Sequence, residues 1–212
     1  MSRKKLASGK GIILGGNPWP PFSIDYPLLL ELIRYMHKKD CPRLLTKMKK
    51  IKLFVFDVDG VLTDNTVWMG RGKTEMKRFN IADGMGVYIA RRAGIPAAFI
   101  SGRPSPATTS RVKELGIVDF YQQRGPKRVP FAKLLKKYKL DPKEVAFMGD
   151  DVIDVPIMQI AGVAATVPHA PDYVKKYVDL VTDHEAGMGA AREFIDMVII
   201  AKGLDPVDLT YK

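Results

Sequence analysis

Two aspartates, Asp57 and Asp59, stand two residues apart directly after an apolar run and are followed by Gly60. Carboxylates this close repel each other unless a cation lies between them or one of them is protonated. A hard divalent cation, which prefers oxygen ligands, meets this requirement most simply. Gly60 allows the chain to curl so that both carboxylates face one point. Taken alone, the same residues fit an acidic turn after a strand equally well.

Polar residues follow three later apolar runs in the same way, and these residues are Ser101, Lys127, and the pair Asp150 and Asp151. Each of them has an ordinary structural explanation, because serine and aspartate cap helices and lysine is commonly solvated. Four such coincidences at the ends of four apolar runs are much rarer than one. We therefore expect these residues to form a single site.

The chemistry that suits these groups is the hydrolysis of a phosphate monoester. The phosphoryl oxygens must be neutralised, and Mg²⁺, the Lys127 ammonium and the Ser101 hydroxyl can do this. One carboxylate can attack phosphorus as the nucleophile, and a second can supply the proton that the leaving alkoxide needs. Asp57 and Asp59 would divide these two roles.

The elements that must position these residues alternate between strand and helix, which predicts an α/β fold with a doubly wound parallel sheet. Expected strands cover residues 53–56, 96–100, 118–121, 145–148, 163–167 and 180–182. Expected helices cover residues 83–93, 105–115, 127–138, 152–161 and 190–202. Parallel strands bring their carboxyl ends to one edge of the sheet, where ligands bind. The polar residues at the strand ends should therefore converge.

Residues 66–79 predict a β-hairpin that projects from the domain, with a glycine-rich turn at 70–73. The stretch between Gly60 and Ser101 has room for this hairpin and one helix, but not for a separate cap domain. We expect a phosphatase domain over 51–203 and a C-terminal tail over 204–212. Residues 1–50 form an N-terminal extension of uncertain role, which includes a predicted helix at 27–38.

Composition narrows the class of protein. Residues 1–50 carry +8 of the net charge of +11, so the remaining chain is nearly balanced and nucleic acid is not an expected partner. The single cysteine, Cys41, excludes an intramolecular disulfide and fits a reducing cytoplasm. No apolar run approaches the ~18 residues of a spanning helix, so we expect no membrane association.

Four motifs in order resemble those of the haloacid dehalogenase superfamily of phosphatases, and they are DVDGVLTD at 57–64, ISGR at 100–103, Lys127, and GDDVID at 149–154. The resemblance covers about residues 51–203. It implies that Asp57 is the nucleophile, which forms an aspartyl-phosphate, and that Asp59 is the general acid and base. It also implies that Ser101 and Lys127 bind the phosphoryl group.

The same resemblance implies a magnesium site. The ligands would be the carboxylates of Asp57 and Asp150 and the backbone carbonyl of Asp59. Asp151 and Asp154 would support the site or share in binding the metal.

Within the superfamily, DGVLTD, KRFNIADGMGV at 77–87 and AGMGAARE at 186–193 are similar to the capless 3-deoxy-D-manno-octulosonate 8-phosphate phosphatases. This implies hydrolysis of a phosphorylated keto-sugar acid to the free sugar acid and phosphate, a step of lipopolysaccharide biosynthesis. It also implies a homotetramer that the hairpins assemble, with neighbouring subunits closing each site. Arg103 suits the sugar carboxylate by bidentate pairing, and Gly102 and Arg78 are further expected sugar contacts.

Three alternatives stay open. The substrate could be a nine-carbon sugar phosphate of the sialic-acid type. The chain could be a signalling receiver domain, but in receivers the phosphate-accepting aspartate follows the third strand, whereas here a second acidic pair follows a late strand. It could also be a catalytically idle interaction subunit, against which the complete set of motifs argues.

Overall fold

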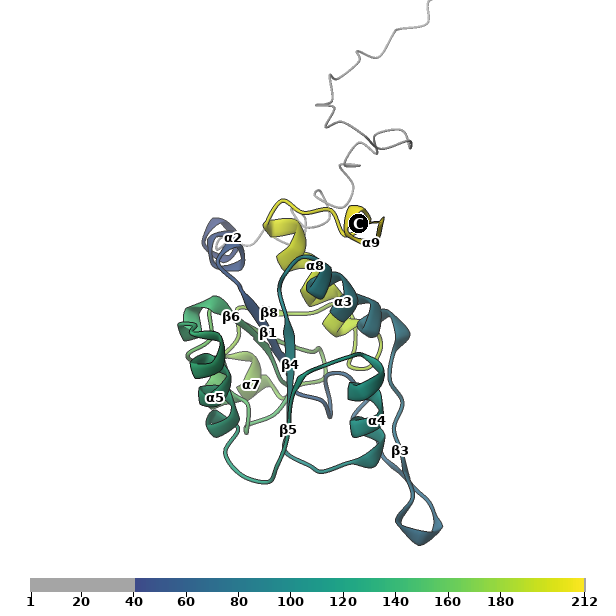
Figure 1. Ribbon diagram of the computed structural model, residues 1–212. Coiled ribbons are helices and arrows are strands. Elements are labelled where there is room, and N and C mark those ends of the chain that lie inside the picture. Colours follow the sequence, from purple (N-terminus) through teal and green to yellow (C-terminus); the bar gives the residue numbers. More distant parts are fainter. Residues whose placement is uncertain (1–40, 212) are drawn as a thin grey trace, which may run out of the picture. The chain divides into compact units, whose positions relative to one another are not determined.

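The structure is a computed structural model that describes residues 41–211 (Figure 1). The helix expected at 27–38 and most of the expected extension therefore lie outside the described residues. Within residues 41–211, no helix is both long and apolar enough to cross a membrane.

A six-stranded parallel sheet with the order β5-β4-β1-β6-β7-β8 forms the centre of the described chain. The strands are β1 (Leu53–Phe56), β4 (Ala97–Ser101), β5 (Asp119–Gln122), β6 (Val145–Met148), β7 (Val163–Thr166) and β8 (Leu180–Val181). Chain order reverses on the two sides of β1, which is the arrangement of a doubly wound sheet. The predicted α/β fold is confirmed.

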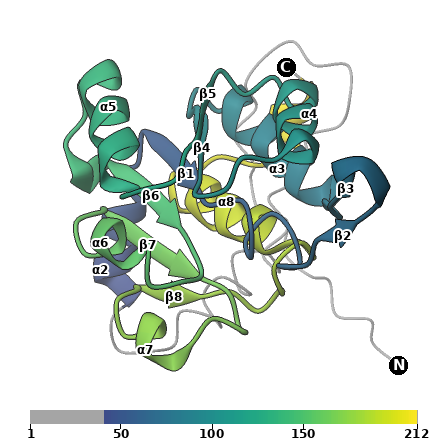
Figure 2. The same ribbon diagram turned by 90° about the horizontal axis from the view of Figure 1, so that it is seen from below.

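Helices cover both faces of the sheet (Figure 2). Helices α3 (Ile81–Arg92) and α8 (Ala190–Ala201) pack together on one face, and α5 (Arg128–Tyr138) and α6 (Val155–Met158) pack on the other. The remaining helices are α2 (Cys41–Lys49), α4 (Pro106–Glu114), α7 (Asp172–Lys175) and α9 (Asp208–Tyr211), with short 3-10 turns η1 (Arg71–Lys73) and η2 (Pro142–Glu144).

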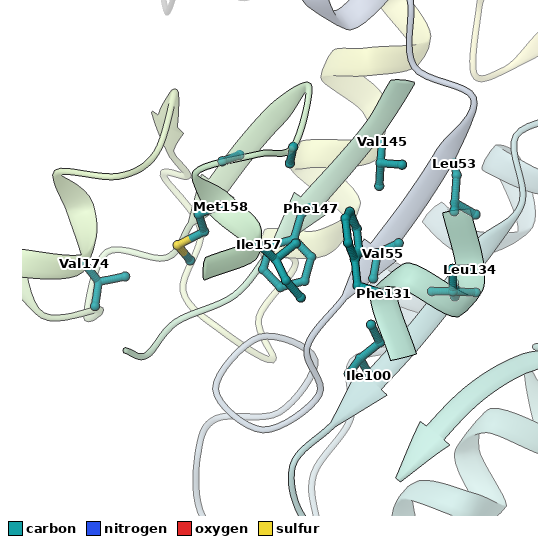
Figure 3. Packing of buried hydrophobic residues seen from close by; sticks show 13 residues of the cluster. Leu53, Val55, Ile100, Phe131, Leu134, Val145, Phe147, Ile157, Met158 and Val174 are labelled. Carbon is teal, nitrogen blue, oxygen red and sulfur yellow. The ribbon is translucent and has the colours of Figure 1, made fainter. Parts of the chain in front are cut away.

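The central strand β1 shows why the sheet needs two covered faces. Its four residues are fully buried, and alternate side chains point to opposite faces. Leu53 and Val55 join the apolar cluster beneath α5 and α6 (Figure 3). Phe54 and Phe56 point the other way, where each ring packs edge-on against Phe194 of α8, with centroids 6.0 and 6.4 Å away.

The helix expected at 152–161 is shorter in the structure and begins only at Val155. Residues 149–154 form a tight loop in which the Asp154 carboxylate accepts hydrogen bonds from the backbone N–H groups of Asp150 and Asp151, at 3.2 and 3.3 Å. That side-chain pairing holds the backbone in a loop where the sequence pattern predicted a helix.

We predicted neither α2 nor α9 as helices. The α2 helix contacts α8 and β7, and its Met48 is buried. The Lys202 ammonium also donates hydrogen bonds to the carbonyls of Lys49 and Ile51. The α9 helix contacts α3 and buries Leu209. The expected N-terminal extension (1–50) and C-terminal tail (204–212) therefore each contribute one helix that packs on the phosphatase domain expected at 51–203.

The predicted hairpin is present, and it projects away from the sheet (Figure 1). Its antiparallel strands, β2 (Trp68–Met69) and β3 (Glu75–Met76), are shorter than the arms expected from the sequence. A single bridge between Thr63 and Phe79 closes its base.

Candidate active site

Asp57 directly follows β1 and is 4% exposed. Three residues later the chain turns at Gly60, whose φ of +82° lies in the region that favours glycine. A Cβ on Gly60 would lie 1.9 Å from a carboxylate oxygen of Asp150, so a side chain there would displace that carboxylate. Gly60 therefore serves both the turn after Asp57 and the close approach of Asp150.

The predicted convergence of strand ends is seen most clearly at Lys127. This lysine precedes α5 and is 3% exposed. Its Nζ lies 2.8 Å from Asp57 Oδ1 and 2.7 Å from Asp154 Oδ1. Burial alone would lower the pKa of the Lys127 ammonium, but the charges of Asp57 and Asp154 outweigh burial and raise it. The lysine is therefore held as a cation.

Asp57 and Asp154, which contact this lysine, form a cluster of three buried carboxylates with Asp150. One oxygen from each of Asp57, Asp150 and Asp154 lies within 4.8 Å of the others. Burial, reinforced by the charge of Asp154, raises the pKa of Asp57 well above its ordinary value and that of Asp150 to about 6. Burial also raises the pKa of Asp154. The single positive charge of Lys127 is therefore not enough to neutralise the three carboxylates.

A divalent cation fits this group of residues. Three carboxylates and one ammonium leave two negative charges without a partner, and a dication with oxygen ligands neutralises them. Asp57 and Asp150, both predicted as ligands, belong to the cluster. Asp154, predicted as a support, belongs to it as well and also anchors Lys127 and the 149–154 loop.

Asp151 lies differently from its neighbour. It is exposed, and its carboxylate accepts a hydrogen bond from the backbone N–H of Val152 at 2.7 Å. The structure does not place its side chain in the acidic cluster. Both its carboxylate and its backbone N–H make hydrogen bonds within the 149–154 loop.

Ser101 ends β4 and is 1% exposed. Its hydroxyl donates to the carbonyl of Arg103 at 2.9 Å and accepts from the N–H of the same residue at 3.2 Å. Gly102 lies beside the Lys127 stem, since a Cβ added to it would meet Lys127 Cε at 3.9 Å. The loop after β4 therefore borders the acidic cluster, as the sequence predicted.

Asp59 is more exposed than Asp57 and faces a residue that we did not predict for the site. Lys77 Nζ lies 2.5 Å from Asp59 Oδ1, and the Lys77 side chain is completely buried. It directly follows the hairpin strand β3 and belongs to the KRFN segment, whose sequence does not indicate Asp59 as its partner. The burial of a lysine side chain cannot be predicted from its residue type or from its neighbours in the sequence.

Arg103 and Arg78 extend the site outward. Arg103 pairs with Glu75 of β3, whose second carboxylate oxygen accepts a hydrogen bond from Ser105. Arg78 pairs with Asp64 at 3.0 Å. Both arginines are about half exposed, which leaves their guanidinium groups open to a ligand from solvent. Glu75 is the second site neighbour that the sequence did not reveal.

The geometry supports acid–base and nucleophilic chemistry at one sheet edge. Asp57 is buried next to a cation, Asp59 is paired with Lys77 and partly open to solvent, and Arg78 and Arg103 are about half exposed. This arrangement suits a small anionic substrate whose phosphoryl group reaches Asp57.

Comparisons with known proteins agree with this geometry. Residues 97–194 match the family described as haloacid dehalogenase-like hydrolase. The chain is 39% identical over 162 residues to a 3-deoxy-D-manno-octulosonate 8-phosphate phosphatase of Salmonella typhimurium, which is 76% of this chain and 86% of the relative.

Solved structures give the same result. The phosphatase of that name from Moraxella catarrhalis, crystallised with magnesium, phosphate and the sugar acid, has a TM-score of 0.76 at 33% identity. That match covers 80% of this chain and 98% of the other. The Yersinia pestis phosphatase has a TM-score of 0.74 at 34% identity, over 76% of this chain and 86% of the other.

Proposed function

The chain belongs to the haloacid dehalogenase-like hydrolases, in the family of the 3-deoxy-D-manno-octulosonate 8-phosphate phosphatases, and from this we propose its substrate and mechanism. It is a phosphoric monoester hydrolase. The proposed reaction converts 3-deoxy-D-manno-octulosonate 8-phosphate and water into the free sugar acid and phosphate, a step that serves lipopolysaccharide biosynthesis. The cofactor is Mg²⁺.

One observation supports this proposal most strongly. Asp57, Asp150 and Asp154 are buried together, and Lys127 contacts two of them, which places the proposed nucleophile, the proposed metal ligands and a cation close to one another. Phosphoryl transfer needs positioning and charge neutralisation more than any other contribution from the protein. This cluster can supply both.

In the proposed first step, an Asp57 carboxylate oxygen attacks phosphorus as the bond from phosphorus to the sugar oxygen breaks. Asp59 gives its proton to that leaving oxygen. In the second step, water attacks the aspartyl-phosphate, Asp59 takes a proton from the water, and the bond between Asp57 and phosphorus breaks to release phosphate. Lys127 and Ser101 bind the phosphoryl oxygens in both steps.

The metal would be held by the carboxylates of Asp57 and Asp150 and by the backbone carbonyl of Asp59. When bound, Mg²⁺ offsets the charge of the carboxylates and of the phosphoryl oxygens. Asp154 orients Lys127 and the 149–154 loop, and Asp151 supports that loop through its backbone.

The sugar acid would be bound outside this cluster. Arg103 pairs with its carboxylate, and Gly102 and Arg78 border the sugar. The catalytic unit is residues 51–203 with the hairpin at 66–79, and the enzyme works as a cytoplasmic homotetramer. The exposed apolar side chains of the hairpin support assembly, because Trp68 and Met69 are each 67% exposed.

Phosphate release from the purified protein tests this function. With Mg²⁺, we expect 3-deoxy-D-manno-octulosonate 8-phosphate to be hydrolysed with a higher kcat/KM than nine-carbon keto-sugar phosphates or p-nitrophenyl phosphate. Asp57→Asn should lose nearly all turnover on every substrate, because an amide is a poor nucleophile. Preference for a nine-carbon substrate would reject the proposed sugar, and activity in Asp57→Asn would reject the proposed nucleophile.

A further inference from the structure

We propose that Lys77 is a positioning residue that holds the Asp59 carboxylate in the orientation needed to protonate the leaving group. The inference rests on the general-acid role proposed above for Asp59. It concerns a buried cation to which the mechanism so far gives no role.

The Lys77 ammonium is well fixed. Its side chain is completely buried although the neighbouring residues of the hairpin are exposed. Nζ lies 2.5 Å from Asp59 Oδ1 and donates a hydrogen bond to Thr108 Oγ1 of α4 at 3.3 Å. Glu75 lies 3.8 Å away on the same arm of the hairpin. Lys77 therefore joins the hairpin, α4 and the loop after β1 at one point.

Burying a lysine is costly unless its charge is paired. A role confined to anchoring the hairpin would not require a cation at this position, because an apolar side chain of similar length would fill the same space. The nearest carboxylate that compensates for burial is Asp59, which contacts Lys77 through one oxygen only, while Glu75 lies farther away. The other oxygen of Asp59 is left without a contact to Lys77.

This one-sided contact has a chemical consequence. Asp59 is 26% exposed and lies in the turn after β1, so without a partner its carboxyl group would rotate among several orientations. Fixing Oδ1 on Lys77 leaves Oδ2 as the oxygen that would carry the proton to the leaving group. A misplacement of about 1 Å at a catalytic group can cost about 10²-fold in rate.

The hairpin therefore contributes to the site from within its own subunit. Residues 75 and 77 are two apart on an extended arm, so their side chains share a face. Lys77 reaches Asp59, and Glu75 reaches Arg103 and Ser105, while Met76 between them is 65% exposed. One short segment thus orients the proposed acid and the proposed sugar-binding arginine.

Leaving-group dependence tests the proposal. Lys77→Met keeps the length of the side chain and removes its charge. We expect kcat/KM for the sugar phosphate and for simple alkyl phosphates to fall about 10²-fold. With p-nitrophenyl phosphate, whose leaving group needs little protonation, kcat/KM should change less than about threefold. The exposed Lys133 of α5 provides a matched control, and Lys133→Met should match the wild type on all substrates.

A double-mutant cycle makes the test specific. In an Asp59→Asn background, Lys77→Met should cause little further loss on alkyl phosphates, because the group that it positions is already inactive. Lys77→Arg, which keeps the charge, should recover part of the alkyl activity. It also serves as the test variant if thermal unfolding shows that Lys77→Met does not fold.

Two results would overturn the inference while leaving the proposed function intact. One is an equal loss on aryl and alkyl phosphates, and the other is a loss that adds fully to that of Asp59→Asn. If Asp59→Asn itself showed no dependence on the leaving group, the proposed acid would be wrong and the inference would fall with it.

Discussion

Asp150 links the charge of the active site to the stability of the protein. Burial and the nearby Asp154 raise its pKa from the ordinary value of 3.8 to about 6, so between these pH values the folded protein without metal holds a proton that the unfolded chain releases. The resulting stability is fully present below the unfolded pKa and is lost as the pH rises through about 6. A bound dication replaces that proton and favours the ionised carboxylate.

We therefore expect Mg²⁺ to raise the melting temperature more at about pH 7.5 than at about pH 5, because at the lower pH protons compete with the metal for Asp150. Thermal unfolding with and without Mg²⁺ at both pH values measures this difference. In Asp150→Asn the Mg²⁺-induced shift should be small at both pH values. A shift that is equal at the two pH values in the wild type would argue against Asp150 as a ligand.

At the scale of elements, the beginning of α8 depends on a residue of another helix. The residue before α8 is Gly189, which has no side chain with which to cap the helix. Asp83 of α3 supplies the cap, because its buried Oδ1 accepts a hydrogen bond from the Arg192 N–H at 2.9 Å. Burial raises the pKa of Asp83, while the hydrogen bond from the Arg192 N–H lowers it in part.

Asp83→Ala should destabilise the protein by about 1–2 kcal/mol, the usual loss for removal of an N-cap. Denaturant unfolding measures this loss. Asp83→Asn should lose less, because its amide oxygen can still accept the same bonds and it carries no buried charge. The exposed Asp172 of α7 provides the control, and Asp172→Ala should change the free energy of unfolding little. Equal values for Asp83→Ala and the control would contradict the capping role.

The cap matters because it also fixes a glycine-rich loop beside the active site. Gly187 in this loop donates a hydrogen bond from its N–H to the Val61 carbonyl at 3.0 Å. A Cβ on Gly187 would lie 2.7 Å from the backbone nitrogen of Asp64, and its φ is +61°. The 186–193 segment therefore packs directly on the loop that carries Asp57 and Asp59. A displacement of the start of α8 would therefore also displace the loop after β1, because the two segments are in contact.

At the scale of the whole molecule, the hairpin exposes more apolar surface than a free hairpin usually does. Val67, Trp68, Met69 and Met76 are exposed, and the two strands pair over only two residues each. An isolated hairpin of this kind is marginally stable. Contact with hairpins of other subunits would cover these side chains, which is the basis of the proposed tetramer.

Replacing both Trp68 and Met69 with Asp should convert the tetramer into monomers, because charges in an apolar interface are costly to bury. Light scattering measures the mass. If neighbouring subunits complete each site, kcat/KM for the sugar phosphate should fall far more than that for p-nitrophenyl phosphate. Val118→Asp replaces another exposed apolar residue, which is 85% exposed and distant in the chain, and should leave both mass and activity unchanged. A monomeric wild type would reject the assembly.

The framework of this protein follows from local patterns in its amino-acid sequence. Apolar runs with polar residues at their ends predict buried parallel strands, and parallel strands must gather those ends at one edge. Asp57, Asp150, Lys127 and Ser101 could therefore be assigned to one site from the order of the residues alone. These predictions depend on local patterns and on one rule of topology, so they need no knowledge of side-chain packing.

The partners that hold these groups in place become visible only once the chain is packed. Lys77 and Asp59 are 18 residues apart, and Asp83 and Arg192 are 109 apart, so nothing in either local sequence identifies the partner. Asp154 delays the start of the predicted helix because its carboxylate binds backbone N–H groups of its own loop. In each case a charged side chain is buried against a specific partner, and burial is a property of the packed chain and not of the residue.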